Sequence, residues 1–260
     1  MQPMPGGKAS GPATTLREVS RIGPYFAIHV GDPDAPPPPG YRPLRDLYRS
    51  GPDAILGQKI TELGRRLRTD ERRVAASTLF LGLAARLWSI ALGAAALAGT
   101  VPDLHPDRTH WHLPPQGPAD LWITTPEQAA EAALPDALHR VVVQHNLAPL
   151  LAATRASTPI AERLLWGNAA SALAGALRVL HHAAPSAAPA ADHLAQDLLS
   201  RAPLAGSGTL TTAPGLPPAF RRTTCCLYYR TPGAGLCVDC VLTTPPRHRI
   251  RHSPKSETTP

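Results

Sequence analysis

The sequence predicts an α+β fold that is predominantly α-helical: a compact helical body, a few short strands and a cysteine-rich lobe near the C-terminal end. Two observations support this prediction. Apolar residues recur at helical spacing over several long stretches, whereas runs of β-branched and aromatic residues are short. All 4 cysteines of the 260 residues fall between positions 225 and 240, in a stretch that also contains proline and glycine.

We expect four segments along the chain. Residues 1–20 are predicted to be a flexible N-terminal segment, and residues 21–220 the mainly helical body. Residues 221–246 form the cysteine segment, and residues 247–260 a basic, disordered tail. A chain of 260 residues is long enough to bury a sizeable core.

The first part of the body is predicted to contain one strand and two helices. The aromatic and β-branched run 24–30 is typical of a strand. Apolar residues from Leu56 to Leu67 step by four, three and four positions, so we expect an amphipathic helix with its arginines off the apolar stripe. Asp70 is the expected N-cap of the next helix, which is rich in alanine and ends near Gly99.

The apolar run from Val74 to Leu97 is long enough to cross a membrane. Arg86 lies near its middle, and much of the run is alanine and glycine rather than leucine or isoleucine. We therefore expect a buried core helix. The N-terminal residues lack the apolar segment typical of export signals, so we expect a cytoplasmic protein.

The middle of the chain is predicted to alternate between loop, strand and helix. Residues 101–118 are expected to form a loop and residues 119–125 a short strand. The tetrapeptide Thr125–Gln128 has the pattern of a capping box with proline at the first helical position, which predicts a helix start. Pro135 and Pro149 are expected to break or kink the helical pattern that follows.

Two further helices are expected before the cysteine segment. Ser157, Thr158 and Pro159 predict a capped start for the helix that carries Trp166 and Asn168. Small residues on that helix would let another helix approach closely. Residues 190–199 predict a last helix with a polar face.

The net charge of +7 does not form a basic face on the body. Residues 247–260 hold four basic residues and one acidic residue, and residues 221–240 hold three basic and one acidic. Little excess charge is left for the rest of the chain, which argues against a nucleic-acid partner. For the tail, a weak peripheral contact with anionic membrane lipid is an alternative to simple disorder.

Eleven histidines prompt a search for a second metal site. His105, His110 and His112 cluster in a proline-rich loop, but the metal-binding spacings H-x3-H and H-E-x2-H do not occur there. We assign these residues, and the pair His181 and His182, to surface or packing roles.

The cysteines form the pattern C-C-x10-C-x2-C, made by Cys225, Cys226, Cys237 and Cys240. Structural zinc usually pairs two knuckles of the C-x2-C type, and only the second half of this pattern has that form. Adjacent side chains on an extended backbone point to opposite faces, so the vicinal pair does not converge easily on one ion. A 2Fe–2S cluster is larger than a single ion and has two metal centres, so a turned Cys-Cys pair can reach it more readily. The spacing favours an iron–sulfur site and leaves a zinc site, or a disulfide or bystander thiols, as alternatives.

This segment resembles the C-terminal signature of the FhuF-like ferric siderophore reductases, whose members bind a 2Fe–2S cluster through C-C-x10-C-x2-C. Tyr228–Arg230 and the Pro232-Gly233 pair add to the resemblance. Weaker similarity is seen in LLWGNAASAL (164–173) and GPYF (23–26). The chain departs from the pattern at Val238, where relatives often have glycine, and a β-branched residue resists the positive φ that glycine allows.

The resemblance implies that the four cysteines hold a 2Fe–2S cluster and that the protein reduces a ferric siderophore by one electron to release Fe(II). Arg221, Arg222 and Arg230 are then candidates to stabilise the reduced cluster or to dock an anionic ferric chelate. Trp166 and Asn168 are candidates for contacts with substrate or cluster, with helix packing as the alternative.

The sequence contains no dinucleotide or flavin fingerprint, and Gly6-Gly7-Lys8 lacks the spacer of a phosphate loop. Electrons are therefore expected from an unidentified donor such as a ferredoxin, a flavodoxin or a reductase. Two other interpretations stay open at this point: a zinc-stapled binding module, and a cluster-bearing sensor or structural protein without reductase activity.

Overall fold

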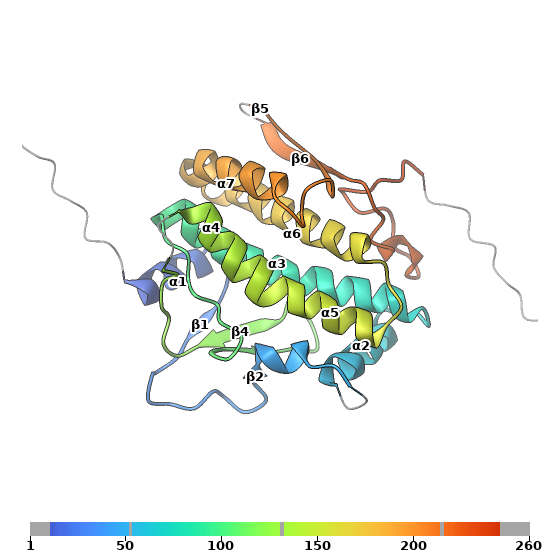
Figure 1. Ribbon diagram of the computed structural model, residues 1–260, viewed down its shortest axis with the longest axis horizontal. Coiled ribbons are helices and arrows are strands. Elements are labelled where there is room, and N and C mark those ends of the chain that lie inside the picture. Colours follow the sequence, from blue (N-terminus) through green and yellow to red (C-terminus); the bar gives the residue numbers. More distant parts are fainter. Residues whose placement is uncertain (1–10, 52–53, 131–132, 214–215, 245–260) are drawn as a thin grey trace, which may run out of the picture.

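Helix α3, Arg72–Ala98, runs through the centre of the protein, and most of its residues are buried (Figure 1). The computed structural model describes residues 11–51, 54–130, 133–213 and 216–244. Alanine and leucine favour the helical backbone of α3, and Gly99 ends it in the left-handed conformation at φ 64°. By length and composition α3 would suffice to cross a membrane, but 78 % of its most apolar window is buried inside the protein. The prediction of a buried core helix is confirmed.

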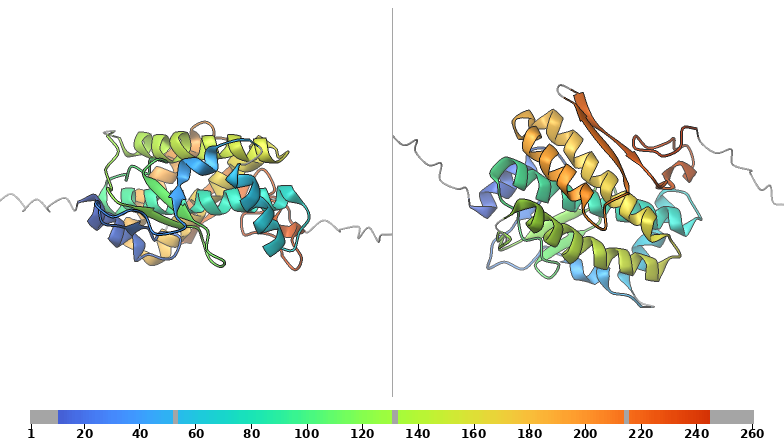
Figure 2. Two further views of the ribbon diagram at one scale, coloured as in Figure 1. Left: turned by 90° about the horizontal axis from the view of Figure 1, so that it is seen from below. Right: turned by 45° about the horizontal axis from the view of Figure 1, so that its top comes forward.

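Other helices pack around α3 in two groups (Figures 1 and 2). On one side lie α6 (Glu162–Ala183) and α7 (Ala188–Ser200), and on the other a continuous helical stretch made of α4 (Leu134–Leu138), a π-helical segment (His139–Leu147) and α5 (Ala148–Ser157). Helices α1 (Pro12–Ser20) and α2 (Ile55–Arg66) pack against α3 as well.

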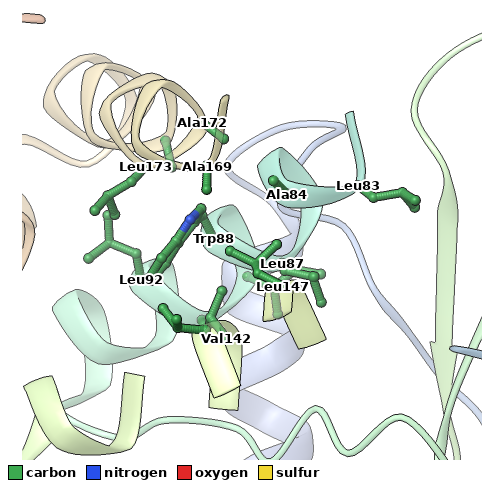
Figure 3. Close-up of a cluster of buried hydrophobic side chains, with 14 of the residues drawn as sticks. Leu83, Ala84, Leu87, Trp88, Leu92, Val142, Leu147, Ala169, Ala172 and Leu173 are labelled. Atoms are coloured by element: carbon green, nitrogen blue, oxygen red, sulfur yellow. The ribbon is translucent and has the colours of Figure 1, made fainter. Parts of the chain in front are cut away.

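Trp88 marks the centre of the core. Its side chain is fully buried and lies between α6, at Ala169 and Leu173, and the helical segment that carries Val142 and Leu147 (Figure 3). Burial of one such aromatic residue removes 150–250 Å² of mostly apolar surface from water, roughly 4–6 kcal/mol at about 25 cal/mol per Å². The core therefore joins both helical groups to α3.

Two small sheets complete the fold. The first has the order β1-β4-β3-β2, with β1 parallel to β4 and the other pairs antiparallel. Its strands are β1 (His29–Val30), β2 (Arg42–Pro43), β3 (Thr109–His112) and β4 (Asp120–Ile123). The second is a hairpin of β5 (Gly208–Ala213) and β6 (Leu216–Arg222), in which Leu210 pairs with Phe220.

Arg86 explains how a charged residue fits in the core helix. Its guanidinium group donates to the carbonyl oxygens of Ala119 and Pro24, each at 2.7 Å, and to that of Ala27. Burial lowers the pKa of Arg86 to about 10, so the group remains charged at neutral pH. The contacts tie the first sheet to α3.

The structure confirms several predicted elements and corrects others. Helices α2 and α7 and strand β4 lie where the periodicity placed them. The predicted flexible segment 1–20 is wrong for its second half, because α1 is a helix that buries Leu16 and Val19 against α3. The strand expected at 24–30 is shorter, at His29–Val30, and the loop expected at 101–118 contains β3.

The three predicted helix starts are also corrected. Glu71 rather than Asp70 occupies the N-cap of α3. The capping box at Thr125–Gln128 does not form, because the backbone of residues 127–129 pairs with residues 101–103 and the Glu127 carboxylate pairs with Arg108 at 2.7 Å. Ser157 is the last residue of α5, and α6 begins only at Glu162.

Neither predicted proline break interrupts the helical stretch. Pro135 and Pro149 each lie in the first turn of a helix, α4 and α5, where a missing N–H is tolerated. At Pro149 the backbone changes from π to α spacing, so the loss of one donor falls where the hydrogen-bond pattern changes anyway. The predicted basic tail, residues 247–260, lies outside the described residues.

Candidate iron–sulfur site

The cysteine loop follows directly from strand β6 and folds back onto α3 and α6 (Figure 2). The backbone N–H of Arg222 donates to the carbonyl oxygen of Asp239 at 3.0 Å, which closes the loop at its base. Leu227, directly after the vicinal cysteines, has φ 68°, a left-handed conformation that is rare for a leucine. The chain therefore turns sharply at the cysteine pair instead of continuing as a strand.

Two of the four sulfurs lie in contact. The Sγ atoms of Cys226 and Cys237 are 3.6 Å apart, and all four cysteines are free thiols. Two thiolates on one tetrahedral metal with bonds of 2.3 Å would be separated by about 3.8 Å. The Cys226–Cys237 pair thus already has the separation that two ligands of the same iron require.

Backbone amides support the other two sulfurs. The N–H of Leu227 donates to Sγ of Cys225 at 3.3 Å, and the N–H of Leu242 donates to Sγ of Cys240 at 3.4 Å. Bonds of this kind stabilise the negative charge of a thiolate. Val238 is 81 % exposed and is not among the described residues with positive φ, so the turn that a glycine would permit there is not used.

The sulfurs do not enclose a single ion. Within the described ranges, no three His, Cys, Asp or Glu side chains are arranged to hold one metal ion. A closed structural zinc site would need four ligands around one centre. The close pair Cys226–Cys237 and two further thiols in the same loop are the metal-binding side chains available here.

Arg222 is a buried cation beside the cysteines. Its side chain is 2 % exposed, and one of its nitrogens donates to the Oδ1 of Asn168. Its Nε and Nη1 groups are buried without a hydrogen-bond partner. Buried N–H groups of a cation need an acceptor, and an anionic cluster would provide it. The residues present therefore fit a 2Fe–2S cluster.

The charge of Arg222 also acts on the thiols. The hydrogen bond between the Cys226 and Cys237 sulfurs lowers the pKa of Cys226, and burial acts against it. The N–H of Tyr228 and the charge of Arg222 also lower this pKa. Burial raises the pKa of Cys225. Metal ligands must be deprotonated, and the charge of Arg222 favours the thiolate forms of these cysteines.

Asn168 connects this site to the core. Its Nδ2 donates to the backbone carbonyl and to the hydroxyl of Ser77, each at 2.9 Å, and the Ser77 hydroxyl donates to the carbonyl of Cys226 at 2.7 Å. One fully buried amide thus holds both the cation and the cysteine backbone. Asn168 lies in the shell around the cysteines, and it is also a helix-packing residue.

The carboxylate inside the C-x2-C knuckle, which was not predicted from the sequence, is also part of the site. Asp239 is buried, accepts from Nη1 and Nη2 of Arg178 at 2.9 and 3.2 Å, and also accepts from the hydroxyl of Ser171. Gly167, one of the small residues expected to let another helix approach, lies instead against the cysteine segment: a Cβ there would be 2.3 Å from Oγ1 of Thr224. The available signal for Asp239 was a charged residue between two cysteines.

The remaining predicted residues have partners other than the sulfurs. Arg221 is exposed on β6 and donates to the carbonyl of Val241. Arg230 pairs with Glu71 at the start of α3, at 2.7 Å. Trp166 donates to Glu162 on its own helix and is packed in the core. Of the five candidates, Arg222 acts on the thiols by its charge, and Asn168 is connected to Cys226 through Ser77.

The cysteine pair opens onto a cleft. A cavity of about 760 Å³ is lined by α2, α3 and α6 and by Cys226 and Cys237. Its volume falls in the range of small-molecule sites. A bound redox centre at these cysteines would therefore be next to a space that can hold a ligand.

Comparison with known families agrees with this geometry. The family model described as "Ferric iron reductase FhuF-like transporter" matches residues 77–213, just over half of the chain, and that described as "FhuF 2Fe-2S C-terminal domain" matches residues 222–242. No curated protein matches the chain. The second match contains all four cysteines, so the cofactor is a 2Fe–2S cluster. The chain therefore belongs to the FhuF-like ferric iron reductase family.

Proposed function

We propose that the protein reduces a ferric siderophore by one electron in the cytoplasm and so releases Fe(II). The observation that supports this most directly is the position of Cys226 and Cys237, which are in contact with each other and line an open cleft. A redox centre held there would be separated from a bound substrate by little more than its own ligands.

The reaction needs one electron and no proton transfer by the protein. The bound 2Fe–2S cluster supplies a one-electron carrier, and Fe(III) in the substrate becomes Fe(II). Oxygen ligands hold Fe(III) far more tightly than Fe(II), so reduction loosens the chelate. Each tenfold preference for the ferric state lowers the reduction potential of the chelate by about 59 mV. The reduction potential of the cluster must therefore be comparably low.

The residues of the site have complementary tasks in this proposal. The four cysteines hold the cluster, and Arg222 places a buried positive charge beside it, which favours the additional negative charge of the reduced state. Asp239 and Asn168 fix the loop to α6 and α3. The electron comes from a separate donor protein, such as a ferredoxin, a flavodoxin or a reductase.

Anaerobic spectroscopy tests the proposal. Protein purified without oxygen should contain two irons and two acid-labile sulfides per chain, and dithionite should give the EPR signal of a reduced 2Fe–2S cluster. Adding a ferric chelate to reduced protein should reoxidise the cluster and yield one Fe(II) per electron, measured with a ferrous trap. Hydroxamate, catecholate and carboxylate chelates should all be tried.

The gallium(III) complexes of the same chelators are the control, because gallium(III) has no accessible divalent state and cannot accept the electron. They should leave the cluster reduced. A reduced cluster that is indifferent to every ferric chelate would contradict the reductase proposal and favour a sensor or structural role for the same cofactor.

A further inference from the structure

The cleft beside the cysteines has a floor made by one face of α3. Thr78, Gly82, Ala85 and Ser89 line it at intervals of four, three and four residues, which is the spacing of one helical face. The eleven residue steps from Thr78 to Ser89, at 1.5 Å each, give a floor about 16 Å long. The hydrogen bond from Ser77 to the carbonyl of Cys226 places the cysteines at the Thr78 end.

Glycines keep the cleft open near the cysteines. A Cβ on Gly82 would have no heavy atom within 4 Å, and the nearest to a Cβ on Gly175 of α6 is Nη2 of Arg178 at 3.8 Å. Ala172 and Ala176 lie on the same side of α6 and also line the cleft. A glycine inside a helix lowers the stability of the helix by about 1 kcal/mol relative to alanine. Close packing does not require glycine at either position here.

Helix α2 forms one wall of the cleft and contributes charged side chains to it. Lys59 and Arg66 both pair with the single carboxylate of Glu62, Lys59 at 2.9 Å. These three side chains therefore have a net charge of +1. Leu63 and Leu67 of the same helix add apolar surface. Such a lining suits an organic ligand with a largely apolar outer surface and some anionic or carbonyl oxygens.

We infer that this cleft is the substrate site. The organic shell of a ferric chelate lies on the stretch between Gly82 and Gly175, its metal end points toward Cys226 and Cys237, and Lys59 and Arg66 face its oxygen atoms. The identity of the ligand rests on the proposed function, whereas the position of the site rests on the lining of the cleft. The glycines leave room for the ligand without contributing to the cluster.

Filling the cleft tests this inference. In Gly82→Leu and Gly175→Leu, a larger side chain enters the open space, and because leucine favours a helix more than glycine does, the fold should be retained. Ala98→Leu is the matched control, since Ala98 is exposed at the end of α3 and outside the cleft. Gly82→Ala gives a smaller step at the same position.

Two quantities should be measured for each variant: the KM for reduction of ferric chelates, and the Kd of the corresponding gallium(III) chelates, which bind without being reduced. We expect both to rise by about tenfold or more in the two cleft leucine variants and less in Gly82→Ala. The cluster absorption, EPR signal and rate of reduction by dithionite should match wild type. Ala98→Leu should match wild type in every measurement.

The outcomes separate this inference from the proposed function. If wild type reduces ferric chelates but the cleft variants keep the wild-type KM and Kd, the site lies elsewhere and the reductase function stands. If wild type binds gallium(III) chelates and the cleft variants bind them more weakly, the position of the site is supported. This holds even if the protein does not reduce the ferric chelates, a result that would contradict only the reductase function. If wild type does not bind any gallium(III) chelate, the inference is overturned.

Discussion

Arg178 of α6 holds Asp239 with two nitrogens, at 2.9 and 3.2 Å, across 61 residues of sequence. In the sequence the carboxylate lies between Cys237 and Cys240, and its side chain is only 4 % exposed. Loss of the arginine would leave a buried charge without its partner, which is far more costly than loss of an exposed ion pair. This contact therefore fixes the C-x2-C knuckle to the helical body.

Arg178→Ala should destabilise the protein by about 3 kcal/mol because the Asp239 carboxylate stays buried without its cation. We expect a lower midpoint in urea unfolding and loss of iron at a lower temperature than in wild type. Arg155→Ala is the control, since the pair of Arg155 with Glu162 is about half exposed and should contribute less than about 1 kcal/mol. Equal stabilities of the two variants would contradict the anchoring role.

Cys226→Ser should remove or strongly alter the cluster, because Cys226 is the buried member of the close pair and the thiol whose pKa is lowered. We expect less iron and sulfide per chain and a changed visible absorption. Val238→Ser, in the same loop but 81 % exposed, should keep the wild-type spectrum. Unchanged spectra in Cys226→Ser would exclude this residue from the ligand set.

Local sequence signals were sufficient for much of the fold. The steps of the apolar residues in α2 and the alanine-rich run of α3 depend on spacing alone, and both helices lie where they were expected. The cysteine spacing likewise identified the cluster segment. Capping signals failed at Thr125–Gln128, since long-range backbone pairing with residues 101–103 competes with a helix there.

The arrangement of the site could not be predicted because it depends on contacts between distant residues. The vicinal cysteines are placed by the left-handed conformation of Leu227, and leucine gives no sign of it. Asn168 and Ser77 are 91 residues apart, and only the packing of α6 on α3 joins them. Of three nearby arginines, burial singled out Arg222, and burial cannot be deduced from spacing in an irregular loop.

The ion pair between Glu71 and Arg230 should make the attachment of the loop to α3 depend on pH. Burial raises the pKa of Glu71, but the hydrogen bond and charge of Arg230 outweigh it, so the pKa is lowered overall. The contribution to stability is therefore present above the unfolded-state pKa of about 4.3 and lost as the pH falls through the lower folded value.

A double-mutant cycle with Glu71→Gln and Arg230→Gln measures this contribution. We expect a coupling free energy of at most about 1 kcal/mol near neutral pH, because both side chains are partly exposed, and a decline toward zero in acid. Urea unfolding of the four proteins across the pH range provides the values. A coupling energy that grows in acid would have the wrong sign for this pair.

Arg222→Gln should lower the reduction potential of the cluster by tens of millivolts. Reduction adds one negative charge, and the buried cation beside the cysteines stabilises that charge, so its removal makes reduction harder. Arg222→Lys keeps the charge and should restore most of the potential. A redox titration followed by EPR measures all three proteins with the same cluster signal.

Arg221→Gln is the matched control for this titration, because it removes the same charge from the neighbouring, exposed residue of β6. Water screens an exposed charge, so we expect its potential to stay close to wild type. Equal shifts in Arg221→Gln and Arg222→Gln would mean that only net charge matters. A fall confined to Arg222→Gln would show that the buried N–H groups, which lack any partner in the protein, are directed at the cluster.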